Sequence, residues 1–140
     1  MAAETNDEEN LIVHRGAHNF VVLNRYPYTS GHLMVVPFAH AAQLNAIEPA
    51  AAAELMEITR MAESCLRNVY QPHGLNLGMN IGESAGAGIA GHIHMHVLPR
   101  WSGDSNFMTT VAETRVLPEE LSVTWTRLHE AFGAATREAL

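Results

Sequence analysis

Hydrophobic positions along the chain either alternate with polar ones or recur at helical spacing, and they predict two helices and several short strands. A long helix is expected to begin at Glu48-Pro49, because proline fits the first turn of a helix, and to stop at Pro72. Its apolar face packs, while the residues expected to face water are Glu54, Glu57, Arg60, Glu63 and Arg67. A terminal helix is expected over residues 118–132. Strands are expected over residues 11–13, 19–23, 33–36, 75–81 and from 92 onward.

This order of elements predicts an α+β fold with a mostly antiparallel sheet of about five strands. The 140 residues suffice for one domain that buries roughly two thirds of its unfolded surface. Four acidic residues without a basic neighbour lie within the first ten positions, so residues 1–10 are expected to form a flexible acidic tail. A single domain is expected over residues 11–140.

The composition argues against several classes of function. The lone cysteine, Cys65, cannot form an intramolecular disulfide or a Cys-x-x-Cys metal site, and we expect a buried thiol. The formal charge is −7, and all eight basic residues are scattered arginines, so a nucleic acid is not expected as ligand. The absence of lysine excludes Schiff-base chemistry. Without an apolar run of about 20 residues or a secretory signal, we expect a cytoplasmic protein that does not bind membranes.

Three histidines alternate with hydrophobic residues in the run His92-Ile93-His94-Met95-His96. In a strand the imidazoles would share one face, roughly 6.5 Å apart, and the hydrophobic side chains would enter the core. Three nitrogen ligands with an open fourth position would suit a catalytic metal ion. Alternatively, a neutral imidazole could attack phosphorus, with flanking histidines assisting and the preceding glycine-rich loop donating backbone N–H groups. The spacing alone leaves both interpretations open.

The run resembles the motif of the histidine triad (HIT) superfamily of nucleotide hydrolases and transferases. Residues 24–37 resemble the upstream segment of that family, in which an Asn or Asp is followed eight residues later by a histidine that opens a strand. Residues 76–82 resemble the strand before the family's phosphate loop. Within the family, residues 86–90 and 99–108 are similar to bacterial diadenosine tetraphosphate phosphorylases and their hydrolase relatives.

The resemblance implies roles for individual residues. His94 would be the nucleophile that accepts a nucleoside monophosphate, and His92 would orient it, partly through the His92 carbonyl. His96 would donate to the phosphoryl oxygens and the leaving side. Phe20 and Val22 are either the border of the base pocket or sheet core. The implied substrate-binding residues are Asn24, His32, Asn80, Ser84, Gly88 and Ile89.

The resemblance also implies a small-molecule nucleotide substrate such as diadenosine tetraphosphate, a nucleotidyl-histidine intermediate and a homodimer. We expect no tightly bound cofactor, with any Mg²⁺ carried by the substrate. Many bacterial relatives have a zinc-binding Cys-x-x-Cys segment, which this sequence lacks, so His40 and His92 have no thiolate partners and no structural zinc is expected.

The acceptor of the nucleotidyl group is expected to be water, because Glu83 adds negative charge to the loop and Arg100 is the only arginine close in sequence to the triad. The alternatives are a phosphorylase, with phosphate as acceptor, and a non-catalytic nucleotide-binding signalling protein.

Overall fold

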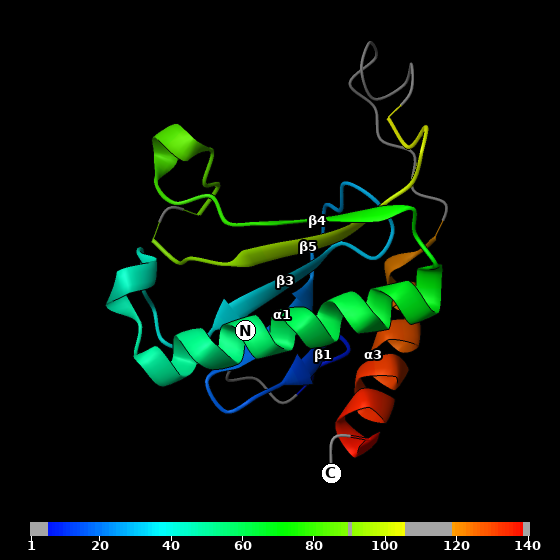
Figure 1. Cartoon of the computed structure of the whole chain (residues 1–140), viewed down its shortest axis with the longest axis horizontal. Coiled ribbons are helices and arrows are strands. Elements are labelled where there is room, and N and C mark those ends of the chain that lie inside the picture. Colours follow the sequence, from blue (N-terminus) through cyan, green and yellow to red (C-terminus); the bar gives the residue numbers. More distant parts are fainter. Residues whose placement is uncertain (1–5, 90, 106–118, 139–140) are drawn as a thin grey trace.

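The computed structural model describes residues 6–89, 91–105 and 119–138. Five strands form one antiparallel sheet in the order β1-β2-β3-β5-β4, which confirms the predicted α+β fold. Two helices, α1 and α3, pack on one side of this sheet (Figure 1). The bounds are β1 Ile12–Arg15, β2 Asn19–Leu23, β3 Leu33–Pro37, α1 Pro49–Tyr70, β4 Gly74–Gly78, β5 Met95–Arg100 and α3 Leu121–Glu138.

The two faces of the sheet carry different side chains, because successive residues of a strand point to opposite sides. One face packs on the helices and supplies the main core, in which Leu33, Val35 and Val97 are fully buried. The other face bears Phe20 and Val22, which form a smaller cluster with Ile12. The strands therefore hold the core on one side and leave the other side for a binding pocket.

Helix α1 begins at Pro49, as the sequence predicts, and its apolar face is buried on the sheet and on α3. The prediction that Glu54 faces water is wrong. Its half-buried carboxylate accepts hydrogen bonds from the backbone N–H groups of Ala17 (2.6 Å) and His18 (2.7 Å) and from the side chain of Asn19 (2.7 Å). The turn between β1 and β2 supplies donors that a reading of the helix alone could not reveal.

The strand that carries the histidines starts later than predicted, at Met95 rather than at His92. Met95 pairs with Val35 of β3. Two residues further along β3 is Pro37, which has no N–H group to donate and ends the pairing of the two strands. The Ile93 N–H group instead donates to the carbonyl of Ala41 at 2.8 Å. The expected division of faces nevertheless holds, since Ile93 and Val97 are buried.

Helix α3 extends beyond the predicted end at residue 132 and continues to Glu138. Two alanines follow Gly133, and their high helix propensity offsets the glycine. Leu128 and Phe132 are fully buried against the sheet and α1, as their spacing predicts. The predicted start at residue 118 lies outside the described residues.

The remaining predictions concern the N-terminal segment and the cysteine. The flexibility of residues 1–10 stays a prediction; residues 1–5 lie outside the described part of the chain, and the Asp7 carboxylate pairs with Arg15 at 2.7 Å. Cys65 is buried, as expected, and burial raises the pKa of its thiol to about 11. Within the described residues, neither helix combines the length and apolarity that crossing a bilayer requires.

The carboxylate of Glu54 is expected to stabilise the fold in a pH-dependent way. Burial acts to raise its pKa, but the hydrogen bonds from Asn19, His18 and Ala17 outweigh burial and lower the pKa. A lowered pKa in the folded state means that the stabilisation is present above the unfolded pKa of about 4.3 and is lost as pH falls through the folded value. Denaturant unfolding at pH 7 should show that Glu54→Gln costs about 2 kcal/mol, because hydrogen bonds to a charged group are lost.

Glu57→Gln is the matched control, because Glu57 is exposed on the same helix and pairs only with Arg60. Its cost should stay within about 0.5 kcal/mol. Equal stabilities of the two variants between pH 3 and pH 7 would contradict the role assigned to Glu54.

Candidate active site

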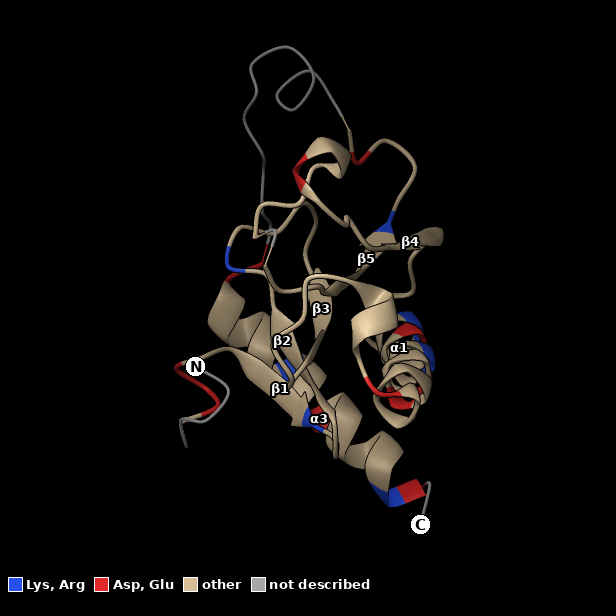
Figure 2. Cartoon of the chain, turned by 90° about the vertical axis from the view of Figure 1, so that its left-hand side faces the viewer, with Lys and Arg blue, Asp and Glu red and all other residues tan. Residues whose placement is uncertain are grey.

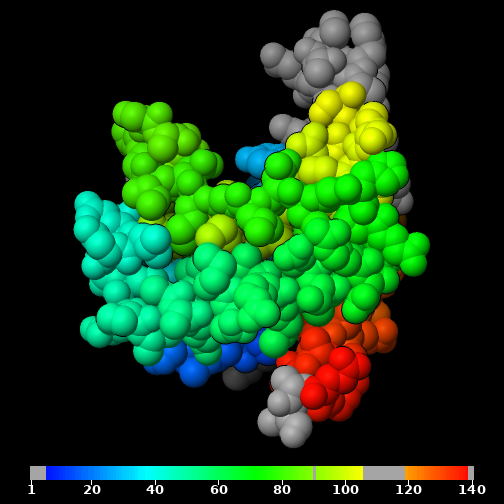
Figure 3. All heavy atoms as spheres, viewed as in Figure 1, coloured from blue at the N-terminus to red at the C-terminus, as the bar shows by residue number. Residues whose placement is uncertain are grey.

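A pocket of about 620 Å³ opens on the face of the sheet opposite the helices. The segment that contains the 3-10 helix η2 (Glu83–Ala85) stands away from the body of the molecule, and a hollow separates it from residues 101–105 (Figure 3). The pocket is lined by Phe20, Val22, Asn24, Tyr26, Tyr28, Met34, Val36, Phe38, Asn80, Gly86, Gly88, Ile89, His92, His94 and His96.

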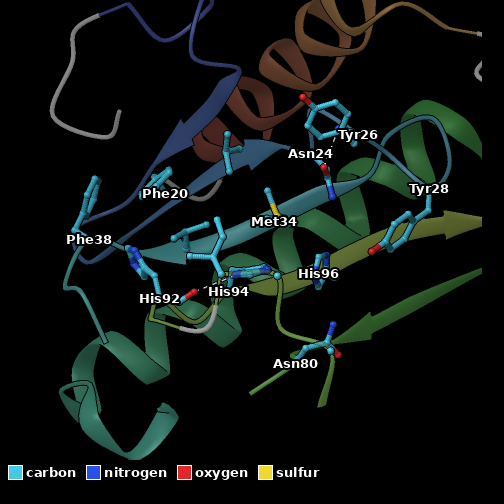
Figure 4. Close-up of a pocket in the computed structure, with 15 residues that line it drawn as sticks. Phe20, Asn24, Tyr26, Tyr28, Met34, Phe38, Asn80, His92, His94 and His96 are labelled. Carbon is cyan, nitrogen blue, oxygen red and sulfur yellow. Dashed lines mark hydrogen bonds between the residues drawn. The ribbon is translucent and has the colours of Figure 1, made fainter. Parts of the chain in front are cut away.

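One end of the pocket is apolar and the other is polar. Figure 4 shows the three histidines in a row, with Phe20 and Phe38 beyond His92 and with Tyr28 beyond His96. The rings of Phe20 and Phe38 lie 5.2 Å apart. Phe20 is buried in the sheet and also lines the pocket, so the two interpretations left open for it hold together. The aromatic end suits a flat, apolar group such as a nucleobase.

The ring of His94 is held by the backbone of His92. Nδ1 of His94 lies 3.1 Å from the carbonyl oxygen of His92. A carbonyl can only accept, so Nδ1 carries the proton and donates, and the lone pair of the neutral ring is on Nε2. His94 therefore presents its basic nitrogen on the side of the ring away from its backbone partner, which is the form a nucleophile needs.

His92 is held in turn by the end of β3. Its Nε2 donates to the carbonyl of Pro37 at 2.8 Å, so its own lone pair is on Nδ1. The ring of His40 meets that of His92 edge-on, with centroids 4.9 Å apart. These contacts hold His92 in place, and with it the carbonyl oxygen that accepts from the His94 ring.

His96 makes its principal contact with a histidine outside the predicted triad. Nδ1 of His96 lies 2.9 Å from Nε2 of His32, which is fully buried behind it at the start of β3. The His94 ring meets that of His96 at 4.8 Å between centroids. Burial, and after it the charge of His94, lowers the pKa of His96. The rings of His94 and His96 are thus in contact, closer than an extended strand alone predicts.

The structure brings most of the implied binding residues to the pocket. Asn24, Asn80, Gly88 and Ile89 line it, and His32 lies behind His96. Ser84 is exposed in η2 and is not among the lining residues. The Ser84 hydroxyl, the side-chain donor expected in this loop, therefore does not line the pocket. The loop residues that do line it are Gly86, Gly88 and Ile89.

No arginine or lysine is among the described residues that line the pocket. Arg100 lies at the far end of β5, where it pairs with Asp104 at 2.6 Å and donates to Asn76 at 2.7 Å. Arg100 in turn lowers the pKa of Asp104 to about 2. The described arginines are spread over several elements (Figure 2) and do not gather at the pocket.

The glycine-rich loop was expected at the site, and Gly86 belongs to it. The sequence did not point to Tyr26, Tyr28, Met34, Val36 and Phe38. Two of these could have been found, because Tyr26 and Tyr28 lie between Asn24 and His32 in a segment already recognised. The N–H group of Tyr28 donates to Nδ1 of His32 at 3.2 Å, and the Tyr28 ring lies 4.7 Å from the His32 ring. Met34 and Val36 belong to β3, whose pocket face could not be assigned from the sequence, and Phe38 directly follows that strand.

The model of the HIT domain matches residues 5–103, which is more than half of the chain. The chain belongs to the HIT domain family. It is 47% identical over 118 residues to a protein of Mycobacterium tuberculosis named AP-4-A phosphorylase, and the match covers 84% of this chain. The chain spans about 60% of the length of that relative.

Solved structures show the same fold. A hypothetical histidine triad nucleotide-binding protein from Sulfolobus tokodaii superposes with a TM-score of 0.75 at 25% identity, over 91% of this chain and 87% of that one. A zinc-bound histidine triad family protein from Mycobacterium smegmatis gives a TM-score of 0.74 at 23% identity, over 92% and 88% of the two chains. Among the described residues of this HIT domain, no three His, Cys, Asp or Glu side chains are placed to hold a metal ion together.

Proposed function

We propose that the protein transfers the nucleotidyl group of a dinucleoside polyphosphate, such as diadenosine tetraphosphate, to His94 and then to a second acceptor. The observation that carries this proposal is the contact of His94 Nδ1 with the His92 carbonyl, which leaves the lone pair on Nε2 in a pocket with an aromatic end. The resemblance to the relative named AP-4-A phosphorylase supports the substrate class.

In the first step the Nε2 lone pair of His94 attacks the α-phosphorus. The P–N bond forms as the P–O bond to the remaining polyphosphate breaks, and the leaving oxygen keeps the electron pair. Positive charge develops on the His94 ring, and the Nδ1–H bond to the His92 carbonyl stabilises it. The N–H groups of Gly88 and Ile89, which make no hydrogen bond within the described part of the chain, are available to the phosphoryl oxygens.

The nucleobase is assigned to the apolar end. Phe20 and Phe38 would pack on it, and the ribose would follow beside His92, so that the phosphorus reaches His94. The rest of the polyphosphate then leaves past His96, toward Tyr28 and Asn80. Along the row in Figure 4, the aromatic end, His92, His94 and His96 would then meet the base, the ribose, the α-phosphate and the leaving group in that order.

Phosphate is the acceptor that the comparison favours, because the relative at 47% identity is named a phosphorylase. Water is a second candidate, favoured by the absence of arginine and lysine among the described lining residues. Water was expected because the loop near the triad carries the negative charge of Glu83 and only Arg100 is close in sequence. Arg100 forms an ion pair with Asp104, which agrees with that expectation. Phosphate would have to be held by backbone N–H groups of the loop before His92, as many anion sites are.

We also propose a homodimer in the cytoplasm. Met56 is 52% exposed on the outer face of α1, and Leu77 is 50% exposed on β4, the edge strand of the sheet. An exposed edge strand beside apolar side chains is a surface that a second copy can cover.

Replacement of the nucleophile is expected to abolish turnover. His94→Ala removes the only nitrogen assigned to the P–N bond, and kcat should fall roughly 10⁴-fold or more, as for other essential nucleophiles. Product chromatography with diadenosine tetraphosphate measures this, and equilibrium binding of AMP should persist. His73→Ala, an exposed histidine beyond the end of α1, should retain normal turnover. Both proteins are assayed after EDTA treatment with Mg²⁺ added alongside the substrate, and normal turnover by His94→Ala would refute the mechanism.

The acceptor is decided by the products. With diadenosine tetraphosphate and millimolar phosphate we expect ADP and ATP, at a rate that saturates with phosphate concentration. AMP and ATP as the main products, at a rate independent of phosphate, would show that water is the acceptor. The two outcomes share the nucleotidyl-His94 step, so either leaves that step standing.

Sedimentation velocity should give a species of twice the chain mass at micromolar concentration. Leu77→Glu places a charge on the exposed edge of β4 and should shift the species toward the monomer. The control Glu57→Gln on α1 changes no apolar contact and should sediment as the parent protein does. A monomer for the parent protein at these concentrations would refute the dimer.

A further inference from the structure

The backbone just before His32 packs on an aromatic side chain from the helix side of the sheet. Gly31 has a φ of +88°, and a Cβ atom added there would lie 2.9 Å from Cε2 of Tyr70. Tyr70 is the last residue of α1 and does not line the pocket. The Gly31 backbone therefore rests on a ring that a substrate in the pocket does not touch.

The Tyr70 ring is itself held from several directions. Its hydroxyl donates to the carboxylate of Glu119. The guanidinium of Arg127 lies over the ring, 4.7 Å from the centroid, and pairs with Glu119 at 2.5 Å. The rings of Tyr70 and Trp101 meet edge to face, with centroids 6.3 Å apart. Burial, and after it the hydrogen bond to Glu119, raises the pKa of Tyr70, so the hydroxyl keeps the proton that it donates.

These partners place the ring at the junction of the two helices. In Figure 1 the end of α1 lies beside the start of α3, and Arg127 of α3 donates to the carbonyl of Val69 in α1 at 2.9 Å. The buried Thr124 of α3 donates to Glu119 at 2.7 Å. The packing of α3 on α1 thus fixes the position of Tyr70, and Tyr70 in turn limits where Gly31 can lie.

The position of Gly31 affects the row of histidines through the next residue. The N–H group of His32 donates to the carbonyl of Thr29 at 3.2 Å, so Gly31 lies inside a tight turn. His32 is fully buried, and its Nε2 lies 2.9 Å from Nδ1 of His96. Hydrogen bonds weaken steeply when the two atoms move apart or out of line. A shift of Gly31 would therefore disturb the contact between His32 and His96.

We propose that Tyr70 is a positioning residue for the reaction: its ring, held where α1 meets α3, sets the backbone at Gly31 and through it the contact of His32 with His96. This inference rests on the proposed function, in which the leaving group passes His96. Misplacement of a reacting group by about 1 Å can cost about 10²-fold in rate. Because Tyr70 acts from outside the pocket, the loss should be in kcat and not in nucleotide binding.

Tyr70→Leu tests the role of the ring. Leucine keeps an apolar side chain in the core but has no atom in place of Cε2, so the contact with Gly31 is lost. With diadenosine tetraphosphate, kcat should fall by at least about tenfold, within the range that such misplacement causes. The Kd for AMP should stay at the parent value. An unchanged kcat, or a Kd that rises by the same factor as kcat falls, would overturn the inference.

Tyr70→Phe separates the ring from its hydroxyl. The variant loses the hydrogen bond to Glu119 and should unfold at a lower denaturant concentration than the parent protein. It keeps the ring on Gly31, so kcat should return close to the parent value. Equal losses of kcat in Tyr70→Phe and Tyr70→Leu would show that the hydroxyl matters and the ring does not, which would overturn the inference.

Phe132→Leu is the matched control for a loosened core. It makes the same change from an aromatic ring to leucine at a fully buried position of α3, where Phe132 stacks on His14. The atoms nearest to a Cβ on Gly31 belong to other residues. The control should lower the unfolding midpoint and keep the parent kcat. A fall in kcat as large as that of Tyr70→Leu would overturn the inference, because any loss of core packing would then have the same effect.

A double-mutant cycle tests whether Tyr70 acts through Gly31. In the parent protein Gly31→Ala places a Cβ atom against the Tyr70 ring, and kcat should fall. In the Tyr70→Leu background the same change should cost at least about threefold less, as expected for residues in contact. The strain of alanine at a positive φ is common to both backgrounds and cancels. Losses that simply multiply would show that Tyr70 acts by another route, such as Trp101, and would overturn the inference.

A measurement without substrate separates this inference from the proposed function. Long-range ¹H–¹⁵N spectra of the labelled protein give the ring nitrogen shifts of His32 and His96, which respond to the contact between them. These shifts should match the parent values in Tyr70→Phe and Phe132→Leu and should change in Tyr70→Leu. Unchanged shifts in Tyr70→Leu would overturn the inference. If the parent protein does not turn over diadenosine tetraphosphate, the proposed function is wrong, and these spectra decide whether Tyr70 positions the two rings.

Discussion

The hydrogen bond between His32 and His96 depends on a loop that several unrelated contacts hold in place. Gly31, just before His32, has a φ of +88°, and a side chain there would meet the Tyr70 ring of α1 at 2.9 Å, so only glycine fits. Thr29 Oγ1 donates to the carbonyl of Pro99 at 2.8 Å and ties the loop to β5. These contacts place the N–H group of Tyr28 on Nδ1 of His32, which in turn contacts His96.

The same strands serve the core and the pocket, and this sharing explains why the site is rigid. Residues Leu33, Val35 and Val97 point into the main core, while Met34 of β3 lies opposite His96 of β5 on the pocket face. A shift of one residue in the β3–β5 register would exchange the two faces and expose the core. The free energy that fixes the core therefore also fixes where His96 meets His32.

Alternation and helical spacing were enough to predict the fold, because they report which side chains share a face. The grouping of the triad with Asn24, His32 and Asn80 came instead from the resemblance to the HIT family. The strand around the histidines was predicted to begin too early, since its start is decided by where Pro37 ends the partner strand. The burial of Glu54 was missed for the same kind of reason: its donors, Ala17 and His18, lie about 35 residues away in the chain. Tertiary partners of this kind leave no periodic signal.

The contact made by His32 could not be deduced from the triad, because the donor that faces its Nδ1 is a backbone N–H group, that of Tyr28. Every residue has such a group, so only its position can distinguish it. In a pocket whose described lining includes no arginine or lysine, the polyanionic substrate that we propose would be held by neutral donors and by packing on the base.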